Sequence, residues 1–481
     1  MLKRFFLVML ALVAVHAADA TVTLPSVIGN NMVLQQQRDV CLWGKASPNA
    51  SVTITASWGK TVTTQASVEG KWKIQIATPE AGGPYNIQFN DGTALTISNV
   101  MIGEVWFCAG QSNMECNMKG KAMDGANYVD FIDGYEKAIA EADVNVPIRV
   151  FMHARSATGT PQDEYTASEF DGTSGSWTVN DANGISNASA TAYFFAKYLQ
   201  SQLHVPVGVI VTAYGGANIK PFMPRSATDE VKAQGDDINY DGVIFNSMIS
   251  PLLPVSFKGM LWYQGEANID AIANGKEYPG LYTKMFKALM NSYRKMFPNG
   301  DFPCYYVEIA PLNANNGLVR PDFRAEQALI PSAVDHVGMV STSDVGYSGI
   351  HPPYKEPVGR RLAYWALNRD YGRTDVVCES PVFSRFEAVE NGKAYAYFTN
   401  VQGGGLKSQG AFAGNFEMCG ADGTFYSATG YVDSANNRVL VKSDRMCAIM
   451  PTAVRYCYKD FAAGTVFNGA GLPVIPFRSD H

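Results

Sequence analysis

The sequence has no long run of lysine and arginine and few charged residues of either sign. Charged residues make up 17% of its 481 residues, and the formal net charge is -6. Nucleic-acid binding needs a cluster or stripe of basic side chains, so we expect no nucleic-acid partner. Disorder needs low hydrophobicity and high charge, whereas 47% of this chain is hydrophobic. The composition is therefore typical of a folded globular protein.

Patterns typical of metal sites are missing as well. The sequence contains no CxxC pair, and no two of its six histidines stand at a spacing typical of zinc ligands. We therefore predict neither a metal nor a cofactor. The eight cysteines allow up to four disulfides if the protein is exported.

No hydrophobic run reaches the roughly 20 residues that a membrane-spanning helix needs. The run nearest the start covers residues 5–15, follows Lys3 and Arg4, and precedes Ala18-Asp-Ala20. A basic start, a short apolar run and a small-x-small triplet are typical of a cleaved secretory signal peptide. We predict a signal peptide over residues 1–20, a secreted or periplasmic location, and no insertion into a membrane.

Three regions of the chain differ in pattern, in agreement with the two or three domains that its length predicts. Residues 21–100 consist of short alternating segments separated by turns, which indicates an N-terminal β-sandwich domain. Residues 101–375 alternate apolar strands with amphipathic helices, the pattern of βαβ units and a mostly parallel sheet. Residues 376–481 return to strand-type alternation. We predict an α/β fold whose central domain is flanked by two β-rich domains.

The central domain is expected to carry the chemistry, because open α/β sheets bind ligands at the carboxyl ends of their strands. Helices are expected over residues 190–203, 282–296, 322–334 and 356–368, and strands over residues 105–109, 207–213, 259–263, 304–309 and 337–341.

Ser112 is the candidate nucleophile. In Gly103-Glu-Val-Trp-Phe-Cys-Ala-Gly-Gln-Ser-Asn-Met114 it follows a strand and a glycine, where a sharp turn can expose its hydroxyl. A serine in such a turn is also a common helix cap. Cys108 and Cys116 bracket it, but thiols of an exported chain are more often buried or oxidised, and Cys108 faces away from the turn.

His351 is the candidate base that a serine nucleophile requires. It lies in Ser348-Gly-Ile-His-Pro-Pro-Tyr-Lys355, between a predicted strand and helix, where prolines restrict the backbone. A capping or hydrogen-bonding histidine is the alternative. His204 and His336 stand where another element leads into a strand and are interpreted as structural, while His153 stays a second candidate.

Two segments can supply hydrogen-bond donors to a developing oxyanion. Gly215 and Gly216 follow the strand predicted over residues 207–213, and a glycine lets a backbone N–H approach a substrate closely. The side-chain amide of Gln264, at the end of another strand, is a donor of the right kind, with Asn268 in reserve. Taken singly, a Gly-Gly pair is more often an ordinary turn.

Four motifs together resemble the sialate O-acetylesterase family of the SGNH-hydrolase superfamily. They are residues 103–114, Tyr214-Gly-Gly-Ala-Asn-Ile219, Trp262-Tyr-Gln-Gly-Glu-Ala-Asn268, and Ile350-His-Pro-Pro-Tyr-Lys-Glu-Pro-Val-Gly-Arg-Arg-Leu362. The resemblance continues in residues 32–35, 43–44, 70–72 and 471–477, and so covers nearly the whole mature chain.

This resemblance implies an SGNH-type α/β/α sandwich and a serine esterase that removes O-acetyl groups from sugars. It implies Ser112 as nucleophile, His351 as base, Gly215 or Gly216 as backbone donor and Gln264 as side-chain donor. Related acetylesterases often carry an aspartate three residues before the histidine, where this sequence has Ser348. Two alternatives follow: Asp344 orients the imidazole from seven residues upstream, or a backbone carbonyl does so and the site is a Ser-His dyad.

The family includes enzymes for more than one sugar. The leading substrate is an O-acetylated sialic acid; acetylated xylan or another plant polysaccharide is the alternative, and a non-catalytic carbohydrate-binding protein is an alternative of another class. The carboxylate of a sialic acid calls for an arginine or equivalent donors, which Arg320 and Arg324 can provide. We expect Asn113, Asn268 and Arg324 to contact the substrate.

Cleavage of the signal peptide predicts a mature chain that begins close to Thr21. Mass spectrometry of the protein from its natural source measures this terminus directly. An intact Met1, or a protein that fractionates with inner membranes, would contradict the prediction.

Overall fold

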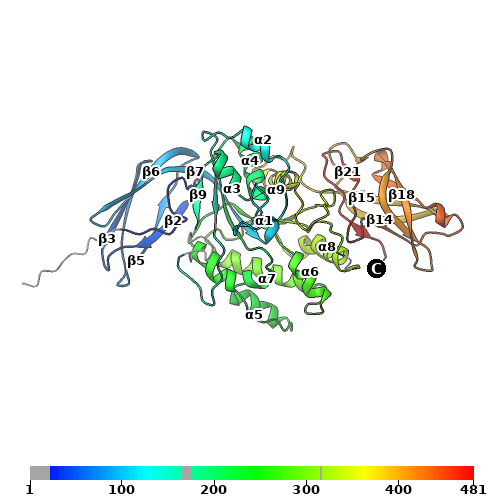
Figure 1. The fold of residues 1–481 in the computed structure, drawn as a ribbon, viewed down its shortest axis with the longest axis horizontal. Coiled ribbons are helices and arrows are strands. Elements are labelled where there is room, and N and C mark those ends of the chain that lie inside the picture. Colours follow the sequence, from blue (N-terminus) through cyan, green and yellow to red (C-terminus); the bar gives the residue numbers. More distant parts are fainter. Residues whose placement is uncertain (1–21, 165–174, 315–316, 481) are drawn as a thin grey trace, which may run out of the picture.

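A computed structural model describes residues 22–164, 175–314 and 317–480. The predicted signal peptide therefore lies outside the described residues. Three lobes follow one another along the long axis of the molecule: a β-rich N-terminal lobe, a central lobe with most of the helices, and a β-rich C-terminal lobe (Figure 1). Within the described ranges, no helix has both the length and the apolar composition needed to cross a bilayer.

The N-terminal lobe consists of two sheets whose buried side chains meet. Its strands are β1 (Val33–Gln35), β2 (Asp39–Lys45), β3 (Ser51–Ala56), β4 (Lys60–Gln65), β5 (Lys71–Ala77) and β6 (Gly82–Asn90). β2 pairs with β5, whereas β3 pairs with both β4 and β6. Alternate side chains of β3 are buried, and Trp72 of β5 packs against Phe89 of β6 with ring centroids 5.8 Å apart. This inward and outward alternation is the pattern that the sequence shows.

Strand β7 (Ala94–Gly110) joins the N-terminal lobe to the central lobe without a break. Its first half pairs with β6, and its second half lies between two strands of the central sheet. Residues 100–110 are buried on both faces, whereas among residues 94–99 only Ile97 is buried. The domain boundary expected between residues 100 and 101 therefore falls inside a strand rather than in a linker.

The central sheet has the strand order β13-β12-β11-β7-β10-β8-β9. Its remaining strands are β8 (Ile148–Met152), β9 (Ser176–Thr178), β10 (Val207–Ala213), β11 (Gly259–Tyr263), β12 (Cys304–Val307) and β13 (Val337–Val340). Neighbours from β13 to β8 run parallel, and β9 is antiparallel. The predicted α/β class is confirmed. The sheet as a whole is mixed, because β7 also carries the antiparallel strands of the N-terminal lobe.

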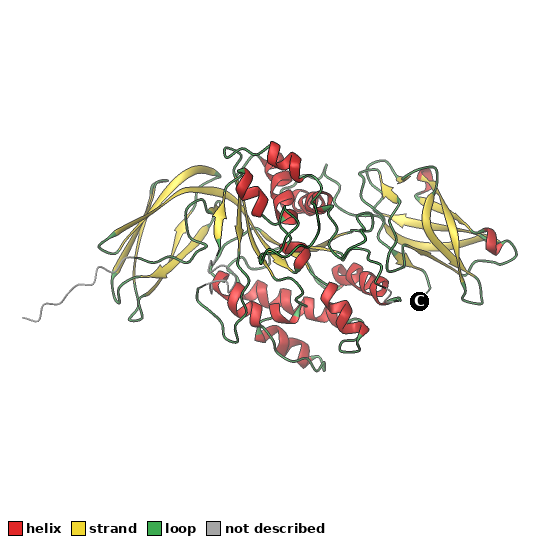
Figure 2. Cartoon of the chain, viewed as in Figure 1, coloured by secondary structure: helices red, strands yellow, loops and turns green. Residues whose placement is uncertain are grey.

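Helices cover both faces of this sheet (Figure 2). They are α1 (Ser112–Glu115), α2 (Tyr135–Ala140), α3 (Ala182–Asn187), α4 (Ala190–Leu203), α5 (Arg225–Ala233), α6 (Glu266–Ala273), α7 (Leu281–Met296), α8 (Val319–Leu329) and α9 (Lys355–Asp370). Single 3-10 turns occupy Lys220–Phe222, Ser250–Leu252, Ile330–Ser332, Ser434–Asn436 and Asp444–Met446, and a π turn occupies Phe245–Ile249.

Local sequence explains where α4 begins and how it packs. The hydroxyl of Ser189 accepts a hydrogen bond from Ala192 N and so caps the helix. The same hydroxyl donates to the carbonyl of Met114 at 2.6 Å, which ties α4 to the turn after β7. α4 packs closely on α9 at Gly359, where a Cβ would lie 2.7 Å from the backbone nitrogen of Phe195. The helices expected around residues 190–203 and 356–368 are therefore confirmed.

The C-terminal lobe is built on a seven-stranded sheet of order β14-β15-β19-β18-β17-β20-β22. Its strands are β14 (Val382–Glu390), β15 (Lys393–Thr399), β16 (Leu406–Ser408), β17 (Ala413–Cys419), β18 (Phe425–Asp433), β19 (Arg438–Lys442), β20 (Ala453–Tyr456), β21 (Val466–Asn468) and β22 (Phe477–Arg478). Tyr458 donates to Asp322 of α8 at 2.6 Å, so this lobe contacts the central lobe beside α8. All eight cysteines fall within the described ranges, and each is an unpaired thiol.

Candidate active site

Ser112 stands in a tight turn where β7 ends. Gly110 has φ 145°, and a Cβ there would lie 2.1 Å from the carbonyl oxygen of Tyr263 on β11. Only glycine allows the two strands to approach so closely at this point. The N-cap of the following α1 is Gln111, so Ser112 is its first helical residue and not its cap.

The side chain of Gln111 anchors this turn to the next strand end. Its Oε1 accepts hydrogen bonds from Gln264 Nε2 at 3.1 Å and from Gly265 N at 3.2 Å. Gly265 precedes α6, whose first backbone N–H groups have no acceptor within the helix. The turn that carries Ser112 is therefore held against the start of α6.

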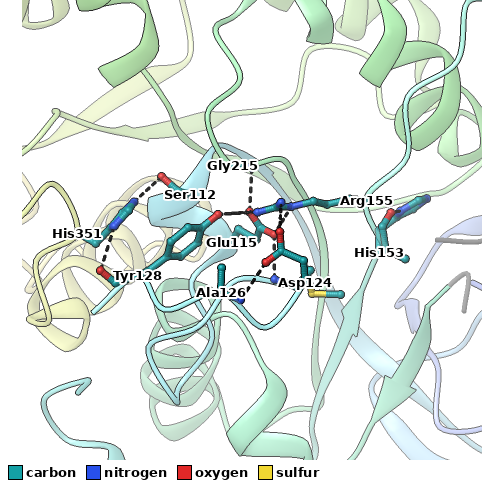
Figure 3. Close-up of polar contacts among 11 residues, drawn as sticks. Ser112, Glu115, Asp124, Ala126, Tyr128, His153, Arg155, Gly215 and His351 are labelled. Atoms are coloured by element: carbon teal, nitrogen blue, oxygen red, sulfur yellow. Dashed lines mark hydrogen bonds and ion pairs between the residues drawn. The ribbon is translucent and has the colours of Figure 1, made fainter. Parts of the chain in front are cut away.

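His351 faces Ser112 from the loop before α9 (Figure 3). Its Nε2 lies 2.8 Å from Ser112 Oγ, and its Nδ1 lies 3.2 Å from the carbonyl oxygen of Tyr128. The Tyr128 ring also lies against the imidazole, with centroids 4.3 Å apart. With Nδ1–H donating to the carbonyl, Nε2 presents a lone pair to the serine hydroxyl. This is the tautomer that a general base needs.

The surroundings of His351 favour its neutral form. Burial, and after it the positive charge of Lys355, lower the pKa of His351 to about 4, although the hydrogen bond to Tyr128 acts in the opposite direction. A group with this pKa is deprotonated at neutral pH. The imidazole is therefore ready to accept a proton across the neutral range.

Asp344 does not face the imidazole. Its two carboxylate oxygens accept hydrogen bonds from the Arg361 guanidinium at 2.7 and 2.6 Å. The carbonyl of Tyr128 occupies the position on Nδ1 that an acid takes in a triad. Of the two alternatives that the sequence leaves open, this geometry is that of a Ser-His dyad.

Two of the three predicted oxyanion donors already bond to the protein. Gly215 N donates to Glu115 Oε2 at 2.8 Å. The Gln264 side chain is 0% exposed, and its Nε2 is within hydrogen-bond distance of three acceptors, the nearest being Asn268 Oδ1 at 2.8 Å. At Gly216 a Cβ would meet nothing within 4 Å, so there is open space beside the Cα of this residue.

The substrate contacts predicted for three side chains are not supported, because these side chains are closed off from solvent. Asn113 and Asn268 are 0% exposed and Arg324 is 1% exposed. Asn268 Nδ2 donates to Glu277 at 2.9 Å, and Arg324 Nε donates to Glu308 at 2.9 Å. Each of the three belongs to the interior of the protein.

Asn113 nevertheless supports the site through hydrogen bonds within the protein. Its Nδ2 donates to Glu266 Oε1 at 2.6 Å and to the carbonyl of Ile350 at 3.1 Å. Its Oδ1 accepts a hydrogen bond from the buried ammonium of Lys355. Asn113, which follows the nucleophile in the sequence, is therefore bonded to Ile350, the residue before His351. Lys355 is not among the predicted site residues, although it lies in the same motif as His351.

The alternative catalytic groups are buried, and none of their side chains hydrogen-bonds to Ser112 within the described residues. His153 is 1% exposed, contacts its neighbouring carbonyl, and lies away from Ser112 (Figure 3). Burial lowers the pKa of His153 to about 3 and raises the pKa of Cys116 to about 11. His204 and His336 lie at element ends with φ of 56° and 53°, in keeping with their structural interpretation.

The ammonium of Lys355 predicts a shift that can be measured. In Lys355→Met, the loss of a positive charge should stabilise the imidazolium, so the pKa of His351 should rise from about 4 towards the ordinary value of about 6.5. An NMR pH titration of the imidazole C–H signals measures this, with the surface variant Lys137→Met as control. A folded Lys355→Met protein with an unchanged His351 pKa would contradict the electrostatic role of Lys355.

Comparison with known proteins agrees with this geometry. Residues 102–362 match a family described as carbohydrate esterase, sialic acid-specific acetylesterase. Sialate O-acetylesterase from Mus musculus is 25% identical over 432 residues, which cover 75% of this chain and 76% of that protein. The human sialate O-acetylesterase is also 25% identical, over 411 residues that cover 75% of this chain and 73% of that protein.

A solved structure is similar over almost the full length. It is a carbohydrate acetylesterase from Xanthomonas citri, which is 30% identical, covers 96% of this chain and 100% of its own, and superposes with a TM-score of 0.81. Because the matching family model spans more than half of its 481 residues, the protein belongs to the sialic acid-specific acetylesterase family of carbohydrate esterases and is a carboxylic ester hydrolase.

Proposed function

We propose that the protein removes O-acetyl groups from sugars with Ser112 and His351 as a catalytic dyad. The observation that carries this proposal is the 2.8 Å contact between Ser112 Oγ and a His351 ring whose other nitrogen faces a backbone carbonyl. A non-catalytic binding protein would have no need to keep both groups in this arrangement. The central lobe, with helices on both faces of its sheet, is then an SGNH-type α/β/α sandwich.

The reaction follows in two halves. Ser112 Oγ attacks the acetyl carbonyl carbon while His351 Nε2 takes the hydroxyl proton, and the collapse of the tetrahedral intermediate returns that proton to the departing sugar oxygen. A water molecule, deprotonated by the same nitrogen, then attacks the acetyl-serine. The collapse of this second tetrahedral intermediate releases acetate, and His351 returns the proton to Ser112 Oγ.

Charge develops on the acetyl oxygen in both halves. We assign the stabilisation of this charge to the backbone N–H groups of Gly216 and of the first residues of α1, because the first N–H groups of a helix have no acceptor within the helix. Gly215 and Gln264 then contribute indirectly. Their N–H groups bond to Glu115, to Gln111 and to the carbonyl of Ala217, and so hold the Gly216 segment and the Ser112 turn in place. Their predicted role as direct oxyanion donors passes to backbone groups beside them.

An O-acetylated sialic acid is the substrate that we propose first. The family description and the names of the mouse and human relatives support it. A neutral acetylated polysaccharide such as xylan is the second candidate. One observation favours it: Arg324, which was expected to meet the sialic acid carboxylate, is buried in an ion pair with Glu308. The relative from Xanthomonas citri is described only as a carbohydrate acetylesterase.

We also propose that the protein is exported, to the periplasm or beyond the cell. The support is the order of Lys3 and Arg4, the apolar run at 5–15 and the triplet that ends at Ala20. Mass spectrometry of the mature N-terminus tests this location.

Ser112→Ala tests the proposed nucleophile. We expect acetate release from an aryl acetate to fall by about a thousandfold or more, since the acetyl group then has no serine to accept it. The melting temperature should change little, because a turn hydroxyl contributes little to the core. Ser348→Ala, which removes a hydroxyl from the loop of His351, is the matched control and should stay active. Retention of more than a few per cent of activity by Ser112→Ala would refute the assignment.

The substrate is decided by acetate release measured side by side on O-acetylated sialic acid and acetylated xylan. We expect kcat/KM to be at least about tenfold higher for the sialic acid, a difference of about 1.4 kcal/mol in transition-state binding. The opposite ratio, with Ser112→Ala inactive on both, would identify the neutral polysaccharide as the substrate.

A further inference from the structure

Glu115 is a buried carboxylate one helical turn after the nucleophile. It is 1% exposed, and it ends α1, which begins at Ser112. Both of its oxygens accept hydrogen bonds from the guanidinium of Arg155, from Nε at 2.6 Å and from Nη2 at 2.8 Å. This bidentate pair is the strongest kind of side-chain hydrogen bonding, and it fixes the plane of the carboxylate.

The same carboxylate connects the two sides of the site (Figure 3). Its Oε2 accepts from the hydroxyl of Tyr128 at 2.8 Å and from Gly215 N at 2.8 Å. Its Oε1 accepts from Met123 N at 3.1 Å. Arg155 adds a hydrogen bond to the Tyr128 hydroxyl at 2.6 Å. One anion therefore holds the loop before Tyr128 and the segment that leads to Gly216.

Tyr128 is the hydrogen-bond partner of this ion pair that also contacts His351. The tyrosine contacts the imidazole twice, with its carbonyl on Nδ1 and with its ring against the ring of the histidine. Its hydroxyl, at the far end of the same side chain, is the atom that Glu115 and Arg155 hold. The position of the phenol therefore sets the position of the carbonyl.

We propose that Glu115, held by Arg155, is a positioning residue that orients His351 through Tyr128 and takes over at a distance the orienting role of the acid in a triad. Its Oε2 also accepts a hydrogen bond from Gly215 N and so fixes the segment that leads to Gly216, the proposed oxyanion donor. One carboxylate therefore determines the position of both the base and this segment. The proposal rests on the proposed function of the dyad. Glu115 does not touch the reacting atoms.

Fold stability alone does not explain this pair. Moving two charges out of water costs several kcal/mol, and a buried ion pair often contributes no more stability than an apolar pair of similar volume. Misplacement of a catalytic group by about 1 Å can cost roughly a hundredfold in rate. The Glu115–Arg155 pair therefore contributes more to the catalytic rate, through the placement of Tyr128 and Gly215, than to folding stability.

The chain provides a matched control in Arg324 and Glu308. Both of these side chains are fully buried, and their contact is 2.9 Å long. Glu308 also accepts from the Ser341 hydroxyl and from Thr342 N, so it resembles Glu115 in its burial and in combining an arginine with neutral donors. Within the described residues its hydrogen bonds reach neither Tyr128 nor His351. Glu308→Gln therefore reports the cost of breaking a buried ion pair without moving the base.

The experiment measures kcat, KM and melting temperature for Glu115→Gln, Arg155→Lys, Tyr128→Phe and Glu308→Gln. We expect kcat to fall about tenfold to a hundredfold in the first two variants, with KM changed by less than about threefold. Tyr128→Phe keeps the ring and the carbonyl but loses the anchored hydroxyl, so we expect a loss of about threefold to tenfold. Glu308→Gln should lower the melting temperature as much as Glu115→Gln but keep kcat.

A spectroscopic readout separates positioning from packing. In protein labelled with ¹⁵N-histidine, the His351 ring should be the Nδ1–H tautomer in the native enzyme and a mixture of tautomers in Glu115→Gln and Tyr128→Phe. If Glu115→Gln does not fold, Tyr128→Phe decides by the same measurements. Folded variants that keep the Nδ1–H tautomer and the kcat of Glu308→Gln would overturn the proposal. An active Ser112→Ala would instead overturn the proposed function, so the two failures are distinguishable.

Discussion

The hydrogen bond between His351 Nδ1–H and the carbonyl oxygen of Tyr128 determines which ring nitrogen faces Ser112. A neutral carbonyl, like a carboxylate, accepts the Nδ1–H hydrogen bond and so orients the imidazole. Because it carries no charge, it stabilises the imidazolium less than a carboxylate does. The low pKa of His351, caused by burial and by Lys355, agrees with this. Such a base is neutral over a wide pH range, and more of the transition-state stabilisation then falls to the oxyanion donors.

A carbonyl is attached to a flexible chain, so the segment that bears it must be held from elsewhere. Two buried networks do this. Glu115 and Arg155 hold the phenol of Tyr128, and Asn113 with Lys355 holds the backbone that leads to His351. In both networks most of the polar atoms have hydrogen-bond partners inside the protein, which offsets the cost of burying them. The dyad is therefore one part of a larger polar assembly.

The position of this assembly follows from β7. Because the strand is buried on both faces from residue 100 onwards, its end is rigid, and the turn at Gly110 delivers Ser112 to the carboxyl edge of the sheet. The segments that follow β10 and β11 end at the same edge, which brings Gly216 and Gln264 to the nucleophile. Because β7 continues into the N-terminal lobe, one sheet extends through both lobes.

The sequence by itself indicated strand-rich ends around an α/β centre and most helices and strands of that centre. It also marked Ser112 and His351, whose side chains lie 2.8 Å apart in the structure. Periodicity reports burial along one element, and the four motifs each end a strand or begin a helix, so local patterns were sufficient. The tertiary structure alone decided the partner of His351, the pairing of Asp344 with Arg361, and the burial of Asn268 and Arg324. These depend on which segments the fold brings together: His351 and Tyr128, for example, are 223 residues apart. A backbone carbonyl is present at every residue, so no side-chain pattern can mark the one that orients a catalytic histidine.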